Sequence, residues 1–297
     1  MPDSDDSSPT PQSMKRAAPR RSSNPPPNQQ VERVLRAMCA NGPGVNANLQ
    51  RTMAVVIRHL HAMLDELQIG EPELIRVYEF LDRVGTNKDT MLLGDHLGLS
   101  MRANDIAYYD PKGTAPNLIG PLYRENAPFM ENPGSMVAPD EPGQHIHMHG
   151  MLRDCDTGMP LPGAVLDFWQ TNAAGFYEDQ DPNLPDYHFR RRIRTDENGR
   201  YAFRTIIPGG YYIANRGTPV VELTQALGLG SFRAPHIHLM VDAEGYRHLT
   251  TLIYFEGEEA NDSDCIFSCR PENTARIVPS EDGDLPDCLF DIDLVRP

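Results

Sequence analysis

The chain has 297 residues, of which 39% are hydrophobic, enough to bury a large core in roughly one or two domains. Its formal net charge of −15 at pH 7 argues against nucleic-acid binding, because phosphate backbones attract clustered lysine and arginine. No apolar run approaches the roughly 18 residues of a membrane span, and no signal peptide is recognisable, so we expect a cytoplasmic protein that is not embedded in a membrane.

Residues 1–30 differ in composition from the rest of the chain. They are rich in Ser, Pro, Asn and Gln and carry almost no large apolar side chains. Such a segment cannot offset the entropy of ordering, so we expect a disordered tail.

Helical spacing of apolar residues begins directly after this tail. Val31, Val34, Leu35 and Met38 follow the i, i+3, i+4, i+7 pattern, and the same period continues from Met53 to Leu67. A third segment starts at Glu71-Pro72, where proline suits a first helical turn. We therefore predict an α-helical domain over residues 31–115.

After Pro116 the pattern changes to short strands separated by turns, which is typical of a β-sandwich or barrel. The predicted strands cover 145–153, 163–170, 189–195, 201–207, 236–242, 248–255 and 289–295. The residues 196–199, Asp-Glu-Asn-Gly, tolerate positive φ and predict a hairpin between the third and fourth strands. The predicted fold is thus mainly β, with a β-sandwich domain over 116–297 after the helical domain.

One predicted strand carries His236 and His238. Side chains alternate along a strand, so these two imidazoles face the same way and can share one metal ion. Neutral imidazole is a common ligand for transition metals. Taken alone, the pair is equally compatible with two hydrogen-bonded histidines on a buried strand face.

His145, His147 and His149 form a rival cluster on another strand. Three alternating residues are spread over about 13 Å, so all three cannot converge on one ion, although two of them can. No acidic ligand follows at short spacing. We therefore interpret this cluster as a polar strand face.

Two groups of tyrosines in the sequence favour a metal site at His236 and His238, and they indicate which metal fits it. Tyr177 follows a predicted strand, and Tyr211 and Tyr212 follow Pro208-Gly209-Gly210. Phenolate oxygen is a hard anionic ligand, and together with two imidazoles it favours Fe(III) over zinc. Such an ion would also ionise phenols far below their free pKa of about 10.

In several motifs the chain resembles the intradiol ring-cleavage dioxygenases, and within them the catechol/hydroxyquinol 1,2-dioxygenase group. The resemblance covers most of the chain from residue 31 onward. Its motifs are the runs 92–101 (LLGDHLGLSM), 120–123 (GPLY), 162–170 (PGAVLDFWQ), 189–196 (FRRRIRTD), 233–238 (RAPHIH) and 245–251 (GYRHLTT).

This resemblance implies a non-haem Fe(III) cofactor bound by Tyr177, Tyr211, His236 and His238. The Pro-x-Gly-Tyr register favours Tyr211 over Tyr212, and neighbours on a strand face opposite ways. Tyr211 is further implied to act as a base toward the substrate. Arg233 matches the family's active-site arginine, which would stabilise negative charge developing on the ring.

The implied reaction is cleavage of an aromatic diol by O2 between its two hydroxylated carbons, giving a muconate- or maleylacetate-type product. The segment 262–267 (DSDCIF) resembles the hydroxyquinol branch, and Cys265 stands where catechol-specific members carry a bulkier aromatic residue. We therefore expect hydroxyquinol (benzene-1,2,4-triol) or a substituted catechol as substrate, with catechol or chlorocatechol as the alternative. The expected pocket residues are Leu93, Asp95, Leu118, Ile119, Pro121, Ile213, Leu252 and Cys265.

Two positions depart from the family pattern. Leu252 stands where many members have glutamine after the Thr-Thr pair, and the run 211–215 lacks the usual prolines. These departures affect the expected substrate more than the expected chemistry.

The resemblance also implies a homodimer formed through the helical domain, with phospholipid bound at its interface in members of the family. A hypothesis of another class is a non-catalytic β-sandwich that binds a metal or an aromatic ligand. The complete set of Tyr177, Tyr211, His236, His238 and Arg233 favours the enzyme.

Overall fold

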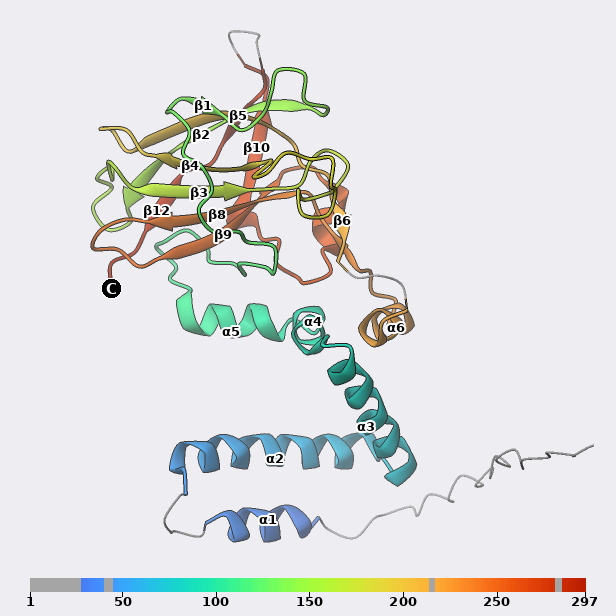
Figure 1. Ribbon diagram of the computed structural model, residues 1–297. Coiled ribbons are helices and arrows are strands. Elements are labelled where there is room, and N and C mark those ends of the chain that lie inside the picture. The colour runs from blue at the N-terminus through green and yellow to red at the C-terminus, as the bar shows by residue number, and fades with distance from the viewer. Residues whose placement is uncertain (1–27, 40–44, 214–216, 281–284) are drawn as a thin grey trace, which may run out of the picture. The chain divides into compact units, whose positions relative to one another are not determined.

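The computed structural model describes residues 28–39, 45–213, 217–280 and 285–297 (Figure 1). The expected tail therefore lies almost entirely outside the described residues. By its contacts the chain divides into a unit that ends at Tyr78 and a unit that runs from Glu79 to Pro297. The predicted boundary near residue 115 follows the change from helices to strands, and it stays a prediction.

Helices occupy the part of the chain where helical spacing predicts them. They are α1 (Gln30–Met38), α2 (Ala47–Leu67), α3 (Glu71–Thr86), α4 (Thr90–His96) and α5 (Leu99–Tyr108). Asn46 caps α2, because its side chain accepts a hydrogen bond from the Leu49 amide, and this capping explains why the helix begins at Ala47. Among the described residues, no helix is both long and apolar enough to cross a membrane.

The division of the chain falls within α3, so α4 and α5 belong to the unit that holds the strands. An ion pair of 2.6 Å between Arg270 and Asp105 joins α5 to the loop that precedes the strand at 274. A sixth helix, α6 (Pro219–Ala226), was not predicted. Its signal is local, because Thr218 caps the Val221 amide and Pro219 occupies the first turn.

Strands make up most of the second unit. They are β1 (Gly134–Ser135), β2 (His145–Asp154), β3 (Val165–Trp169), β4 (Arg190–Arg194), β5 (Arg200–Ile206), β6 (Tyr211–Tyr212), β7 (Phe232–Arg233), β8 (His236–Asp242), β9 (Leu249–Phe255), β10 (Thr274–Val278), β11 (Asp287–Leu289) and β12 (Ile292–Leu294). Short 3-10 turns cover Glu259–Ser263 and Pro271–Asn273. The protein is thus mainly β with helices before the strands, as predicted.

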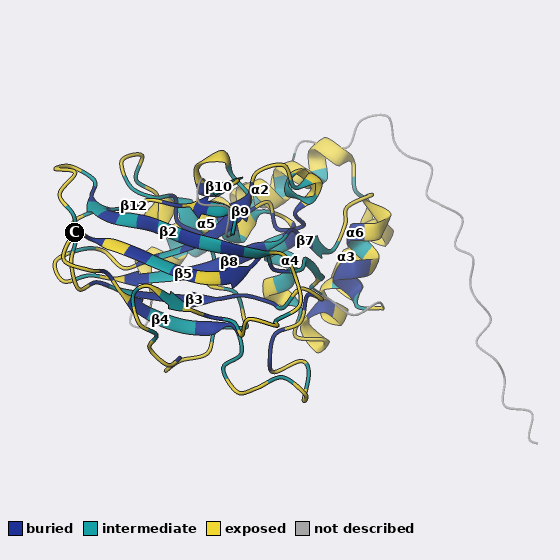
Figure 2. Ribbon diagram, turned by 90° about the horizontal axis from the view of Figure 1, so that it is seen from above, coloured by how far each residue is buried: buried dark blue, intermediate teal, exposed yellow. Residues whose placement is uncertain are grey.

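The hydrogen-bonded order β1-β5-β2-β11-β10-β9-β8-β3-β4 folds back on itself, with β12 also paired to β2. Its two halves face each other across one apolar core, in which the rings of Phe168 on β3 and Phe203 on β5 lie 4.7 Å apart. Buried and partly exposed residues alternate along β2, as Figure 2 shows. Ile146 and Met148 face the core, so the three histidines that alternate with them face outward.

The predicted hairpin between the third and fourth strands is wrong. The turn at Asp196 exists, with its amide bonded to the Arg200 carbonyl at 2.9 Å. However, β4 pairs with β3, whereas β5 pairs with β2 along seven residues of register. Pairing with these more distant strands prevents β4 and β5 from pairing with each other. The turn at Asp196 instead carries the chain from one half of the sandwich to the other. The predicted last strand likewise divides into β11 and β12.

Asp167 on β3 gives a prediction about stability. Its carboxylate is only 7% exposed and accepts a hydrogen bond of 3.2 Å from the Tyr123 hydroxyl. Burial raises the pKa of Asp167 from 3.8 to about 6, so the folded protein holds this proton more tightly than the unfolded chain does. Asp167 therefore lowers the free energy of unfolding progressively as the pH rises from 3.8 to about 6.

Asp167→Asn is expected to increase the free energy of unfolding by up to about 3 kcal/mol at pH 8 and to give almost no gain near pH 4. The amide oxygen can still accept the Tyr123 hydrogen bond, so the change removes mainly the ionisation of a buried group. Urea unfolding of both proteins at several pH values measures the difference. An equal gain at all pH values would contradict this explanation.

Candidate active site

His236 and His238 both lie on β8 and are each 3% exposed. As expected for alternate residues of a strand, they share a face, while Ile237 between them belongs to the apolar core. Their Nε2 atoms lie 3.2 Å apart. Two nitrogens at this separation can bind the same ion, because zinc or iron ligands about 2.1 Å from a metal lie roughly 3 Å from one another.

The hydrogen bond of His236 fixes its tautomer. Its Nδ1 lies 2.6 Å from the Ala234 carbonyl oxygen, which can only accept, so Nδ1 carries the hydrogen. The Nε2 lone pair of a neutral His236 therefore points toward His238. Burial and then Arg233 lower the pKa of His236 to about 3, and burial and then His236 lower that of His238. Both rings are neutral, which is the form that binds metals.

Tyr177 and Tyr211 lie on the same side as the histidines. The two phenol rings meet edge to face at 5.8 Å, Tyr177 lies 6.4 Å from the His238 ring, and Tyr211 lies 5.8 Å from His236. Tyr212 is 72% exposed and packs on Phe232 instead. The structure thus brings together the four residues predicted as ligands and turns Tyr212 away from them.

The hydroxyl of Tyr177 provides a test of whether an ion fits here. The residue is 1% exposed, and its buried hydroxyl interacts with that of Tyr211 but makes no hydrogen bond of ordinary geometry to any described residue. An unpaired buried hydroxyl costs about 1–3 kcal/mol. Burial and then the neighbouring Tyr211 raise the pKa of Tyr177 well above 10, so the chain alone keeps this phenol neutral. A cation of high charge would ligate and ionise the oxygen, and Fe(III) suits this donor set.

Arg233 lies on β7 directly opposite Tyr211 on β6. It is 4% exposed, and its Nε donates to Asp264 Oδ1 at 2.7 Å. One terminal nitrogen donates to the Tyr254 hydroxyl at 2.8 Å and to Ser268 Oγ at 3.3 Å. Asp264 Oδ2 in turn accepts from both of these hydroxyls, at 3.0 and 2.9 Å. The guanidinium is therefore held rigidly beside the phenols and imidazoles.

Asp264 stays ionised within this network. Burial is the largest single influence and raises the pKa of its carboxyl, but the charge of Arg233, acting together with the hydrogen bonds from Arg233 and Ser268, lowers the pKa below 3.8. The same cation opposes the effect of burial on Tyr211, whose pKa is nevertheless raised. Arg233 thus favours negative charge at the position where Tyr211 and a bound anion would lie.

Two further side chains contact the proposed metal ligands. The Trp169 ring stacks on His238 at 4.6 Å, because the two residues are partners in the register of β3 and β8. Arg190 lies 5.5 Å from the centre of the Tyr177 ring, and its Nε donates to both carboxylate oxygens of Glu178 at 2.6 and 2.7 Å. Sequence reasoning assigned no role to these residues, since only the three-dimensional structure reveals their contacts.

The expected pocket residues Leu118, Ile119 and Pro121 surround Gly120, which lies against His238. A Cβ added at Gly120 would come within 3.3 Å of His238 Cε1, and the residue has φ +73°. This segment therefore passes directly over the imidazole. Leu118 is half-buried, and Ile119 and Pro121 are exposed.

The remaining pocket candidates lie on other elements. Leu252 on β9 is buried opposite His238, and the amide of buried Cys265 donates to the Phe232 carbonyl at 3.1 Å. Asp95 on α4 is close enough to contribute to the raised pKa of Cys265. Leu93 on α4 and Ile213 after β6 are half-buried. Ala214 and Asn215, the end of the run that lacks prolines, lie outside the described residues.

Gly120→Ala is expected to lower both stability and ring-cleavage activity. A left-handed φ strains alanine by about 1–2 kcal/mol, and the new methyl group also presses on His238. Gly158→Ala is the matched control, because Gly158 has φ +68° and open space where a Cβ would lie. We expect both variants to lose similar thermal stability and only Gly120→Ala to lose activity, by roughly tenfold. Equal activity in the two variants would show that the contact between Gly120 and His238 does not matter for ring cleavage.

Comparison with known proteins agrees with this geometry. The family model described as the catechol dioxygenase N terminus matches residues 46–114, and the model described as dioxygenase matches residues 118–295. A fold rich in β-strands with converging histidines and tyrosines thus lies within a family of dioxygenases.

Individual relatives show the same relationship. The chain is 34% identical to a 6-chlorohydroxyquinol 1,2-dioxygenase of Cupriavidus pinatubonensis, over 80% of this chain and 87% of that protein. It is 32% identical to a catechol 1,2-dioxygenase of Acinetobacter baylyi, over 90% and 92%. The solved hydroxyquinol 1,2-dioxygenase of Pseudomonas putida superposes with a TM-score of 0.83 at 27% identity, covering 90% of this chain and 98% of that one.

The chain therefore belongs to the intradiol ring-cleavage dioxygenases. It is an oxidoreductase that opens an aromatic ring between two hydroxylated carbons and incorporates both atoms of O2. The alternative of a non-catalytic β-sandwich is accordingly set aside.

Proposed function

We propose that this enzyme cleaves hydroxyquinol or a closely related substituted catechol, giving a maleylacetate-type product. The observation that carries the proposal is Cys265, a small side chain that is 5% exposed and near enough to Tyr211 to influence its pKa. A small residue here leaves room for a third ring substituent. The relatives named for hydroxyquinol and 6-chlorohydroxyquinol support the same substrate class.

We further propose that Tyr177, Tyr211, His236 and His238 hold a non-haem ferric ion. When bound, Fe(III) would lower the pKa of the diol hydroxyls and draw electron density from the ring, which would make the ring reactive toward O2. Tyr211, with its phenol ionised, accepts one substrate proton at its oxygen, and solvent hydroxide accepts the other. Arg233 stabilises the negative charge of the diolate.

Colour provides a direct test of the ferric site. Tyrosinate-to-Fe(III) charge transfer should make the purified protein reddish-brown, with about one iron per chain. A colourless protein that stays inactive after loading with iron would contradict the proposed ligands. Removal of the iron with a chelator should abolish both colour and activity, and ferric salt should restore them together.

Oxygen uptake with hydroxyquinol, catechol, 4-methylcatechol, chlorocatechols and pyrogallol tests the substrate. We expect the highest kcat/KM for hydroxyquinol. Cys265→Phe should fill the space beside the ring and reduce the preference for hydroxyquinol over catechol by about tenfold or more. Cys155→Phe is the control, since Cys155 is half-buried after β2 and its amide donates to the Leu294 carbonyl at 3.0 Å, on elements that carry none of the proposed iron ligands or pocket residues. An unchanged preference in Cys265→Phe would remove this residue from the specificity pocket.

Catechol or chlorocatechol is the second candidate substrate. The catechol 1,2-dioxygenase of Acinetobacter baylyi is nearly as similar to this chain as the hydroxyquinol enzymes are, and it matches a larger share of both chains. A kcat/KM for catechol above that for hydroxyquinol would favour this alternative and overturn the first.

We also propose that the enzyme acts in the cytoplasm as a homodimer formed through the helical domain, with phospholipid at the interface. In support, none of the residues of α2 is buried, and its exposed apolar side chains include Leu49, Val55, Leu60 and Leu67. Sedimentation of the purified protein tests the dimer, and mass spectrometry of its organic extract tests the lipid.

A further inference from the structure

A second cluster of metal-binding side chains lies on the outer face of the sandwich, on strands that the proposed iron site does not use. His147 and His149 on β2 alternate with buried core residues and so face outward. β11 pairs with β2 in parallel, and Asp287 is the register partner of His147. Partners in a sheet share a face, so the carboxylate stands beside both imidazoles.

The three ligand atoms are close enough to hold one ion. Asp287 Oδ1 lies 3.1 Å from His147 Nδ1 and 3.4 Å from His149 Nε2, and all three atoms lie within 4.8 Å of one another. The two imidazole rings are stacked at 5.1 Å. Ligands about 2.0–2.2 Å from a zinc ion lie roughly 3.0–3.5 Å from one another, so only a small movement of the two histidines is needed.

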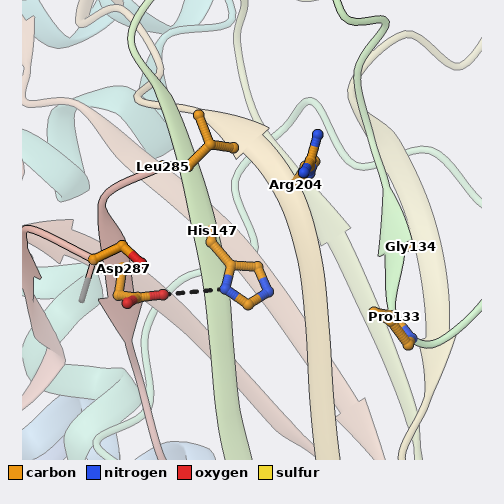
Figure 3. A pocket seen from close by; sticks show the side chains of 7 residues that line it. Pro133, Gly134, His147, Arg204, Leu285 and Asp287 are labelled. Carbon is orange, nitrogen blue, oxygen red and sulfur yellow. Dashed lines mark hydrogen bonds and ion pairs between the residues drawn. The ribbon is translucent and has the colours of Figure 1, made fainter. Parts of the chain in front are cut away.

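The surroundings leave room for the remaining ligands of such an ion. The side chains of His147, His149 and Asp287 are 39%, 34% and 30% exposed. His147 and Asp287 line a pocket of about 490 Å³, together with Arg204 and Leu285 (Figure 3). Solvent can therefore complete the coordination shell. The charge of Arg204 opposes a cation, whereas Asp291 adds to the negative potential at His149.

We propose that His147, His149 and Asp287 form a site for a divalent transition metal ion of the zinc class, separate from the proposed ferric site. Two imidazoles and one carboxylate form a common donor set for zinc, and water fills the open positions. Because its ligands come from β2 and β11, the ion would also cross-link two strands that are 140 residues apart in the chain.

This proposal changes the interpretation of the three histidines as a polar strand face. The spacing of the histidines in the sequence does not reveal their acidic partner, because the carboxylate comes from β11 near the end of the chain. His145 does not join the cluster, since its Nε2 lies 2.7 Å from the Glu141 carbonyl oxygen. It is therefore the matched control on the same strand and the same face.

Equilibrium dialysis of the full chain against Zn(II), with zinc and iron both counted, tests the site. We expect the wild type to bind one zinc ion with no loss of iron. His149→Ala and Asp287→Asn should weaken this binding by about tenfold or more, and His145→Ala should leave it unchanged. Zinc should also raise the thermal unfolding temperature of the wild type and of His145→Ala only.

Two results would overturn the proposal. One is equal zinc binding by the wild type, His149→Ala and Asp287→Asn, and the other is zinc uptake only as iron is lost. Either would show that the three side chains form only ordinary hydrogen bonds. This test does not depend on the ferric site. If the outer site binds zinc, wild-type protein without iron would still bind more zinc than the His149→Ala variant without iron.

Discussion

Tyr177→Phe is expected to remove most of the bound iron and to lower kcat/KM for ring cleavage by at least about a thousandfold. The substitution deletes one anionic oxygen and keeps the buried ring, which is 1% exposed and packs against Tyr211 and His238. The tyrosine oxygen has no hydrogen-bond partner among the described residues. Its loss therefore affects mainly the bound ion, and otherwise only the interaction of the hydroxyl with Tyr211.

Thermal stability distinguishes this explanation from a general structural role. Without metal, Tyr177→Phe should be as stable as the wild type or more stable by about 1 kcal/mol, because an unpaired buried hydroxyl is removed. With ferric iron, the wild type should be the more stable protein. Iron content, the charge-transfer band and the unfolding temperature of both forms measure these effects.

Tyr212→Phe is the matched control for this experiment. Tyr212 follows Tyr211 directly, yet it is 72% exposed and faces Phe232. Its variant should keep full iron content, colour and activity. Full iron and activity in Tyr177→Phe would remove Tyr177 from the ligand set, and a loss in Tyr212→Phe would contradict the assignment of the second tyrosine.

The alternation of side chains made part of this site predictable from the sequence. His236 and His238 had to share a face of one strand, and only one of Tyr211 and Tyr212 could join them. The structure agrees on both points, with the histidine Nε2 atoms 3.2 Å apart and Tyr212 turned outward. Local periodicity also predicted most strands, because apolar side chains alternate where one face of a strand is buried.

Features that depend on long-range register were not predictable in this way. Trp169 stacks on His238 because β3 and β8 are neighbours, and Asp287 stands beside His147 because β11 pairs with β2. The turn at Asp196 predicts a hairpin, yet β4 and β5 pair with different strands. No local pattern specifies which distant strands become neighbours, since that choice depends on the packing of the whole core.

Arg233→Lys is expected to lower kcat by about a hundredfold to a thousandfold and to leave the iron content unchanged. Arginine offers a planar fork of donors, and here the fork reaches Asp264, Tyr254 and Ser268 at once. Lysine keeps the positive charge but cannot make these bonds in the same geometry. Its charge would thus no longer be fixed beside Tyr211 and the substrate.

Arg247→Lys, at an exposed position after β8, is the control for this change and should behave as the wild type. Steady-state kinetics with iron counted in the same samples measures the effect. If Arg233→Lys keeps the wild-type kcat, a positive charge alone is sufficient and the fork has no role in the reaction.

Asp264→Asn tests whether the carboxylate acts by positioning Arg233. It retains the arginine and the shape of the side chain but leaves the buried guanidinium without its counter-charge, which should destabilise the fold by about 3–5 kcal/mol. The exposed neighbour Asp262 offers the control Asp262→Asn. If positioning is the role of Asp264, its variant should lose kcat as Arg233→Lys does, and the double variant should lose little more. Fully additive losses would mean that the two residues act separately, whereas the shared hydrogen bonds of Tyr254 and Ser268 indicate that they act as one unit.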